Sequence, residues 1–211
     1  MTEHRPVALV TGGGRGTGAA VVRALAARGH AVAIHCHASL REARALAEEL
    51  TAAGTPAFAL TADLREEGAV RALVHRVADR FGRIDVVAAC AGRRRTARLE
   101  ELTAADLASH YEVNVIGTFV VAQEAAAVMF GQESGGVILA LADGGEPRPD
   151  ELASAASRAA IPALMRALDA ECRPRHPRVR AACLTIPSPP PPPVTLAALL
   201  VDRIHALHAA Q

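Results

Sequence analysis

The stretch Val7-Ala8-Leu9-Val10-Thr11-Gly12-Gly13-Gly14-Arg15-Gly16-Thr17-Gly18 decides the fold. Its four apolar residues predict a buried strand, and the apolar run from Ala19 predicts a helix after the glycine-rich turn. Glycines let a pyrophosphate approach bare backbone, and the helix start offers unpaired N–H groups and a positive dipole end. The position between a strand and a helix favours a dinucleotide-binding turn; a tight turn without a ligand is the alternative.

Strand and helix patterns alternate along the rest of the chain. Besides the strand that ends at Thr11, apolar runs predict five buried strands, at 31–36, 56–61, 84–89, 137–142 and 179–186. Long helices are predicted over 103–130 and 152–172, and Ser39 is predicted to cap the helix after the second strand. The alternation predicts an α/β fold, a doubly wound parallel sheet (Rossmann fold) in a single domain over 1–211, with strand order 3-2-1-4-5-6.

The composition limits the classes of function. Of the 211 residues, 51% are hydrophobic and 2% aromatic, and the formal net charge of +1 gives no general attraction for nucleic acid or a membrane surface. Four scattered cysteines are typical of reduced thiols in the cytoplasm and not of a disulfide frame or zinc site. We expect a cytoplasmic protein with no metal, no signal peptide and no stretch long enough to span a bilayer.

Three motifs resemble those of the short-chain dehydrogenase/reductase family. Thr11 to Gly18 is similar to the family's TGxxxGxG, Asp85 to Gly92 to its strand ending in NNAG, and Val113 to Phe119 to its VNxxGxF. The resemblance covers nearly the whole chain up to Ile186, and it implies a nicotinamide cofactor and a small-molecule substrate. The cofactor contacts that it implies are Thr11, Gly12, Gly14, Arg15, Gly16, Thr17, Gly18, Asp63, Leu64, Ala91 and Gly92.

The catalytic positions depart from the family's pattern. The segment from Ser154 lines up with YxxxKxA, which puts Ser154 at the tyrosine position and Arg158 at the lysine position. Asn114 matches the asparagine of the family's catalytic tetrad, and the active-site serine falls at Asp143. A serine hydroxyl without a base cannot replace the tyrosine, and an arginine cannot relay a proton. These four residues form the candidate catalytic site, with lost activity and changed chemistry both left open.

Asp143 also resembles a residue of pteridine reductases, a branch of the same family that carries aspartate at the serine position. These enzymes have a His-x-His-x-Ser pattern similar to the segment from His35 to Ser39. A turn aspartate before Gly144 is the alternative for Asp143, and His35 by itself is interpreted as a satisfied strand residue.

The second strand indicates which nicotinamide cofactor binds. No acidic residue ends this strand, where NAD-binding folds hold the ribose 2′-hydroxyl. Arg15, with His37 and Ser39 nearby, is expected to bind a 2′-phosphate instead, so the expected cofactor is NADP(H). Arg41 is either part of this site or a solvated helix residue.

Three functions stay open. The first is an NADPH-dependent reductase of a small carbonyl or imine/iminium metabolite with an atypical site; an iminium accepts hydride without a proton donor, and Asp143 would stabilise its charge. The second is a non-redox biosynthetic catalyst such as a cyclase, isomerase or dehydratase, and the third is an inactive member of the family. The basic loop Arg93 to Arg95 is expected to overhang the cleft, either binding an anionic substrate or cofactor phosphate or lying in solvent.

The end of the chain and the two long helices carry the remaining predictions. Pro189 to Pro193 are expected to adopt polyproline II and not to be helical, with the Pro-rich segment 187–195 in place of the family's substrate lid. The resemblance implies a homodimer built on the two long helices, and a dimer is expected rather than a tetramer. Small residues on these helices are expected at the interface: Ala122, Ala125, Ala126, Ala127, Ala155, Ala156, Ala159, Ala160 and Ala163.

Overall fold

A computed structural model describes residues 5–143, 146–187 and 190–209. It contains one sheet of six parallel strands in the order β3-β2-β1-β4-β5-β6, which confirms the predicted doubly wound fold and its strand order. The strands are β1 (Val7–Thr11), β2 (Ala31–Cys36), β3 (Ala57–Thr61), β4 (Val86–Ala89), β5 (Gly136–Asp143) and β6 (Val179–Ile186).

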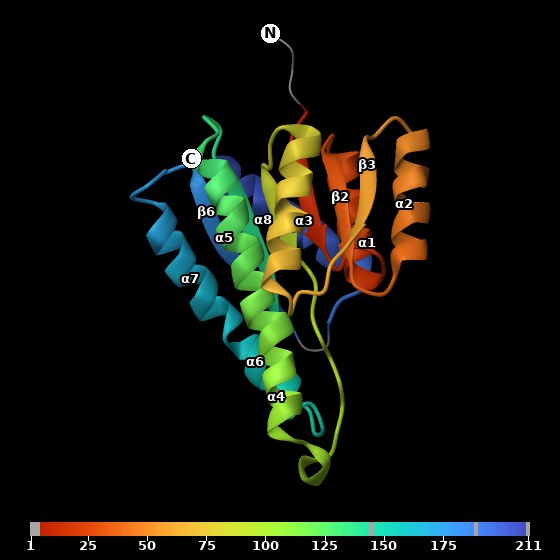
Figure 1. Ribbon diagram of the computed structural model, residues 1–211, viewed down its shortest axis with the longest axis vertical. Helices are drawn as coiled ribbons and strands as arrows, with labels where there is room; N and C mark the ends of the chain where they lie inside the picture. Colours follow the sequence, from red (N-terminus) through yellow and green to blue (C-terminus); the bar gives the residue numbers. More distant parts are fainter. Residues whose placement is uncertain (1–4, 144–145, 188–189, 210–211) are drawn as a thin grey trace.

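Helices cover both faces of the sheet (Figure 1). Successive residues along each strand face opposite helix layers, so that Leu9 belongs to one apolar cluster and Val10 to the other. One layer consists of α1 (Gly16–Ala27), α2 (Leu40–Ala52) and α8 (Pro193–Ala209). The other consists of α3 (Glu67–Phe81), α5 (Gly117–Phe130) and α7 (Ile161–Cys172).

A projection extends beyond the carboxyl ends of the strands (Figure 1). It contains the short turn η1 (Leu99–Glu101), α4 (Ala104–Tyr111), the π-helical turn η2 (Glu112–Ile116) and α6 (Leu152–Ala159). The first long helix is continuous, as predicted, through α4, η2 and α5, and Thr103 begins it with a capping box to Asp106. The second is interrupted at Ala160, because Pro162 near the start of α7 has no N–H for a helical hydrogen bond.

Two local predictions at helix starts were wrong. Pro193 is the first residue of α8, a position at which the missing N–H of proline has no intrahelical partner to lose. Ser39 does precede α2, but its side chain makes no capping hydrogen bond within the described residues. Pro189, the first residue of the proline run, lies outside the described residues, so the predicted polyproline II conformation stays a prediction there.

The predicted dimer face also needs a correction. Ala122, Ala125 and Ala126 are at most 3% exposed, because they pack on the sheet inside the same chain. Of the alanines predicted on α5, only Ala127 is exposed. The face that α5 presents outward therefore has larger side chains, including Phe119.

The helix over Ala104–Phe130 also differs from the expectation about membrane spans. It is long and apolar enough to cross a bilayer by length and composition alone. In the structure, half of its most apolar window is buried inside the protein, as in the core helix of a globular fold.

Candidate active site

The glycine-rich turn joins β1 to α1 through closely packed backbone. Gly12 has a φ of +67°, and a Cβ there would lie 2.7 Å from the Cα of Ala91. A Cβ on Gly18 would lie 2.1 Å from the carbonyl oxygen of Gly12. A Cβ on Gly16 would meet no described atom within 4 Å. Gly12 and Gly18 are therefore needed for packing, whereas Gly16 faces open space at the start of α1.

The start of α1 suits an anion. Among the described residues, no side chain caps this end, and no acidic residue lies in the first turn. The first N–H groups of the helix consequently have no side-chain acceptor, and they point out of the positive end of the helix dipole. Thr11 Oγ1 accepts a hydrogen bond of 3.2 Å from the N–H of Ala91 and ties this turn to the end of β4. The residues present thus fit the diphosphate of a dinucleotide.

The region where a 2′-phosphate was predicted lies beside this turn. A Cβ on Gly14 would lie 2.3 Å from Ser39 Oγ, so Ser39 packs against the glycine turn while His37 is exposed. Arg15 Nε lies 4.0 Å from a carboxylate oxygen of Glu42, and both side chains are well exposed. The structure therefore brings Arg15 and Ser39 to the turn, as predicted, but it adds an acidic neighbour that the sequence analysis did not consider.

Two polar residues near this region have clear structural partners. His35 is a buried strand residue with its Nε2 3.1 Å from the carbonyl oxygen of Ala62, and burial lowers its pKa. The expectation that it is satisfied is met only in part, because its Nδ1 has no hydrogen-bond partner among the described residues. Asp63 forms a bidentate pair with Arg65, whose guanidinium lowers the pKa of that carboxyl to about 2. Asp63 is therefore ionised at every physiological pH.

Asn114 joins three segments in the projection. Its Oδ1 accepts a hydrogen bond of 2.6 Å from the N–H of Arg93, and its Nδ2 donates to the Arg93 carbonyl oxygen at 3.2 Å and to Ser157 Oγ at 2.8 Å. The side chain is 3% exposed and lies in the η2 turn. Asn114 thus fastens the loop after β4 to α6. The sequence analysis missed Ser157, because no motif marks that position.

Arg158 reaches the same place from α6. A Cβ on Gly92 would lie 2.7 Å from Nη2 of Arg158 and 3.4 Å from Oδ1 of Asn114. Three predicted site residues therefore meet at the end of β4. Ser154 is 1% exposed, and its hydroxyl has no hydrogen-bond partner among the described residues. The backbone of Asp143 ends β5 in register with Ile186, and its side chain lies outside the described part.

A cleft of about 590 Å³ lies at the carboxyl ends of the strands. Thr17 and Cys90 line it from the cofactor side, and Pro187 and Pro190–Pro193 line it from the segment before α8 and from the first residue of α8. Its charged lining residues are Arg94, Glu146, Arg148, Glu151 and Arg158. Burial raises the pKa of the Cys90 thiol to about 12, so this thiol is protonated near neutral pH. Three of the charged lining residues lie in a loop without a motif, so the sequence did not predict them in the cleft: Glu146, Arg148 and Glu151.

The basic loop is held by ion pairs. Arg94 forms a pair of 3.0 Å with Glu151 at the start of α6, and Arg95 pairs with Asp106 on α4. Both carboxylates are at most 15% exposed. These pairs attach the loop to the helices of the projection. The loop therefore has a structural role that was not among the two predicted ones, binding an anion or lying in solvent.

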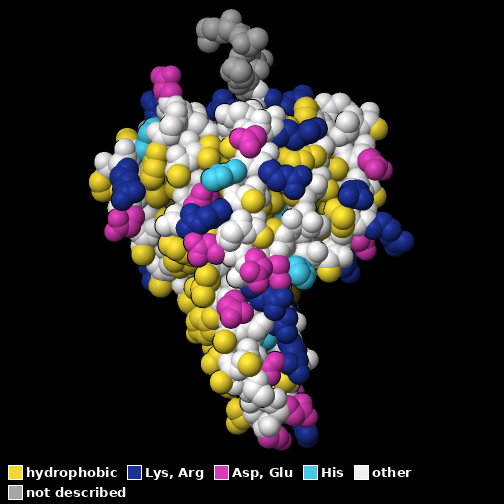
Figure 2. Space-filling view, in the orientation of Figure 1, with side chains coloured by type: hydrophobic (Ala, Val, Ile, Leu, Met, Phe, Trp, Pro, Cys, Tyr) yellow, Lys and Arg dark blue, Asp and Glu magenta, His cyan; other side chains and the backbone are white. Residues whose placement is uncertain are grey.

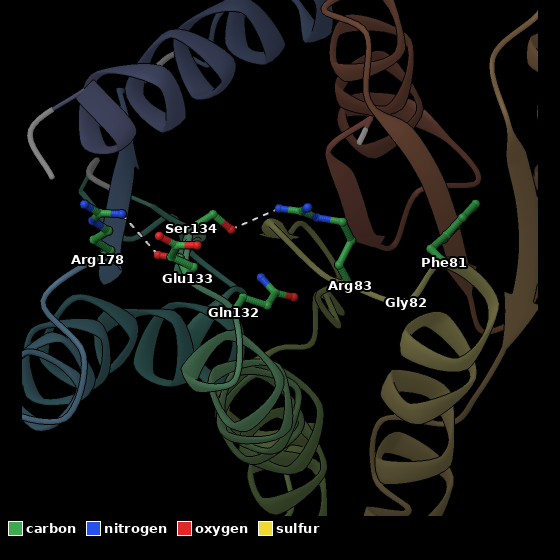
Figure 3. A pocket seen from close by; sticks show the side chains of 7 residues that line it. All are labelled: Phe81, Gly82, Arg83, Gln132, Glu133, Ser134 and Arg178. Atoms are coloured by element: carbon green, nitrogen blue, oxygen red, sulfur yellow. Dashed lines mark hydrogen bonds between the residues drawn. The ribbon is translucent and has the colours of Figure 1, made fainter. Parts of the chain in front are cut away.

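A second groove, of about 530 Å³, lies at the amino ends of the strands and is lined by residues that precede β4, β5 and β6 (Figure 3). Its polar groups bind one another: Arg83 donates to Asp85 and Ser134, and Gln132 bonds the backbone of Ile84. In doubly wound folds, ligands bind at the carboxyl ends of the strands. We therefore assign this groove a structural role.

Comparison with known proteins decides the family. The short chain dehydrogenase family model matches residues 6–189. The chain belongs to the short-chain dehydrogenase/reductase family. Within it, the chain is 37% identical over 166 residues to hydroxynaphthalene reductase of Aspergillus fumigatus, covering 78% of this chain and 60% of that protein. The chain spans about half the length of several curated relatives; for versicolorin reductase 1 of Dothistroma septosporum, the matched part is 45% of that protein's length.

Two solved structures of this family resemble the chain closely. One is a short chain dehydrogenase of Burkholderia cenocepacia in complex with NADP, with a TM-score of 0.78 and 35% identity over 84% of this chain and 72% of that one. The other is a metagenomic short-chain oxidoreductase in complex with NADP, with a TM-score of 0.86 and 27% identity over 94% of this chain and 90% of that one.

Proposed function

We propose that the chain is an NADP(H)-dependent oxidoreductase that reduces a small carbonyl or imine metabolite at an atypical site. The observation that carries this proposal is the uncapped start of α1, whose residue Thr17 lines the same cleft as Arg158. Family membership supports it, as do the NADP complexes of the two neighbouring structures and the reductase activity named for the relatives.

We assign the parts of the cofactor to the residues that the structure gathers around the turn. The N–H groups from Gly12 to Gly18 would hold the diphosphate, Asp63 and Leu64 the adenine, and Arg15 with His37 and Ser39 the 2′-phosphate. Ala91 and Gly92 would lie beside the nicotinamide ribose, whose hydroxyls Arg158 would bind. When bound, NADPH supplies a hydride to the substrate.

The chain's own residues then have to stabilise the charge that develops on the substrate oxygen. Arg94 holds the pKa of Glu151 below its usual range, and burial raises the pKa of the Cys90 thiol to about 12. Neither of these two residues of the cleft donates a proton readily near neutral pH. We therefore assign Arg158 an electrostatic role toward this oxygen, with the proton coming from solvent. Asp143 is proposed as a further polar residue of the site, and Asn114 as a positioning residue.

Cofactor binding is the first test. In Gly18→Ala, the Cβ 2.1 Å from the Gly12 oxygen forces the turn to shift, so NADPH affinity measured by its fluorescence should fall at least about tenfold. Gly68→Ala is the matched control, because a Cβ there meets no described atom within 4 Å. Equal affinities of the two variants, with both folded by circular dichroism, would contradict the assignment. Tighter binding of NADH than of NADPH would contradict the role of Arg15.

The alternative is a non-redox catalyst or an inactive member of the family. It is favoured by the buried hydroxyl of Ser154 at the position of the family's tyrosine. NADPH labelled with deuterium at its transferable position separates the candidates: deuterium in a product supports the reductase, and cofactor binding without any transfer supports the alternative.

We also propose that the chain forms a homodimer in the cytoplasm. Large apolar side chains are exposed on the helices of the projection and on α5, namely Tyr111, Ile116, Phe119 and Leu152, and hydrophobic surface follows one side of the projection in Figure 2. Such a face is typical of an interface between copies. The four free cysteines suit a reducing compartment.

A further inference from the structure

The cleft at the carboxyl ends of the strands has two walls of different chemistry. One wall contains Pro187 and Pro190–Pro193, with Leu196 in the first turns of α8. Each of these prolines has a fixed φ and an apolar ring, so an apolar body that packs against them would restrict few torsion angles of the protein.

The other wall is charged and contains several guanidinium groups. The described lining residues include three arginines, Arg94, Arg148 and Arg158, against two acids, Glu146 and Glu151. Glu151 is paired with Arg94 at 3.0 Å. That hydrogen bond lowers the pKa of Glu151 most, and the charges of Arg148 and Arg158 lower it further, so both are near the same carboxylate. One carboxylate thus lies among three guanidinium groups.

We propose that the cleft takes a substrate in which an apolar body carries an anionic oxygen group, a carboxylate or a phosphate. The body packs on the proline wall, and the anion binds Arg148, an exposed arginine at the rim. Guanidinium groups match both oxygen groups in geometry, and they repel a cation. This inference rests on the proposed function, because it concerns the substrate of the same cleft.

Calorimetry with four small probes tests the inference on the full chain saturated with NADP⁺. The probes are cinnamate, phenyl phosphate, the uncharged cinnamamide and the cationic cinnamylamine. At least one anion should bind about tenfold more tightly than cinnamamide, and cinnamylamine should bind most weakly. The tighter anion tells carboxylate from phosphate. Arg148→Ala should abolish the preference, whereas Arg98→Ala, which removes an exposed arginine paired with Glu101, should keep it.

NADPH binding, measured on the same samples, separates this inference from the proposed function. Equal binding of anions and cinnamamide, or no binding of any probe, overturns the inference even where NADPH binds. An unchanged preference in Arg148→Ala overturns the assignment of that residue. A charge preference that depends on Arg148 in a chain that binds no NADPH supports the anion site and overturns the oxidoreductase.

Discussion

Replacing Asn114 with alanine should destabilise the fold by an amount that can be worked out from its contacts. The change removes three hydrogen bonds, two with the backbone of Arg93 and one with Ser157. Each contributes about 0.5–1.5 kcal/mol, and the groups left behind are shielded from water. We therefore expect the free energy of unfolding to fall by about 2–4 kcal/mol. Ser157→Ala loses one of these bonds and the bond that its own hydroxyl donates to the carbonyl oxygens of Ala153 and Ser154, and it should cost about 1–2 kcal/mol.

Urea unfolding followed by circular dichroism measures these differences. The double variant Asn114→Ala/Ser157→Ala should show a coupling of at least about 0.5 kcal/mol, because the two side chains contact each other. Gln123→Ala, an exposed change on α5, should lie within about 0.5 kcal/mol of the unchanged protein. If Asn114→Ala costs no more than Ser157→Ala, the hydrogen bonds to Arg93 do not stabilise the fold, and the reasoning is refuted.

Three further predictions follow from the site, the helix contacts and the projection. Ser154→Tyr/Arg158→Lys restores the tyrosine and the lysine of the family's pattern, with Asp143 still at the serine position, and should raise the rate of NADPH oxidation with carbonyl substrates by about 10²-fold or more, the contribution of general acid catalysis; an unchanged rate in a variant that is folded by circular dichroism would contradict our view of the missing donor. Burial lowers the pKa of His30, His205 and His208, so these histidines bind a proton less readily in the folded state than in the unfolded state. The free energy of unfolding should consequently fall as the pH drops below about 6.5, the unfolded-state value, and equal urea midpoints at pH 7.5 and 5.5 would exclude this. Ala159→Glu, an exposed change on α6, should convert the proposed dimer to a monomer by light scattering, and a dimeric variant would place the interface elsewhere.

Much of the fold could be predicted from the sequence because it depends on local patterns. The strand-turn-helix from Val7 onward and the alternation after it fixed the sheet order, since right-handed crossovers leave few arrangements. The errors occurred where one residue has two compatible roles. Proline is excluded from helix interiors but favoured at a first position, as Pro193 shows. Small residues suit either an interface or a core, and Ala125 is in the core.

The site could be predicted less completely, because tertiary contacts decide it. Motif matching found Asn114 and Arg158, which the structure brings together beside Gly92. It gave no signal for Arg148 or Glu151, which reach the cleft only through the path of a loop without a motif. The pairing of the basic loop with the helices of the projection likewise depends on contacts between distant segments.

The contacts of Asn114 also change what its presence implies about activity. Its amide is occupied by the backbone of Arg93 and by Ser157, so packing alone explains an asparagine at this position. The open start of α1 is different, because among the described residues no side chain takes up the N–H groups of its first turn. A helix end of this kind is expected to have an acceptor, and a diphosphate supplies one. The glycine turn therefore suits a nucleotide cofactor by itself, even if Arg158 and Ser154 carry no chemistry.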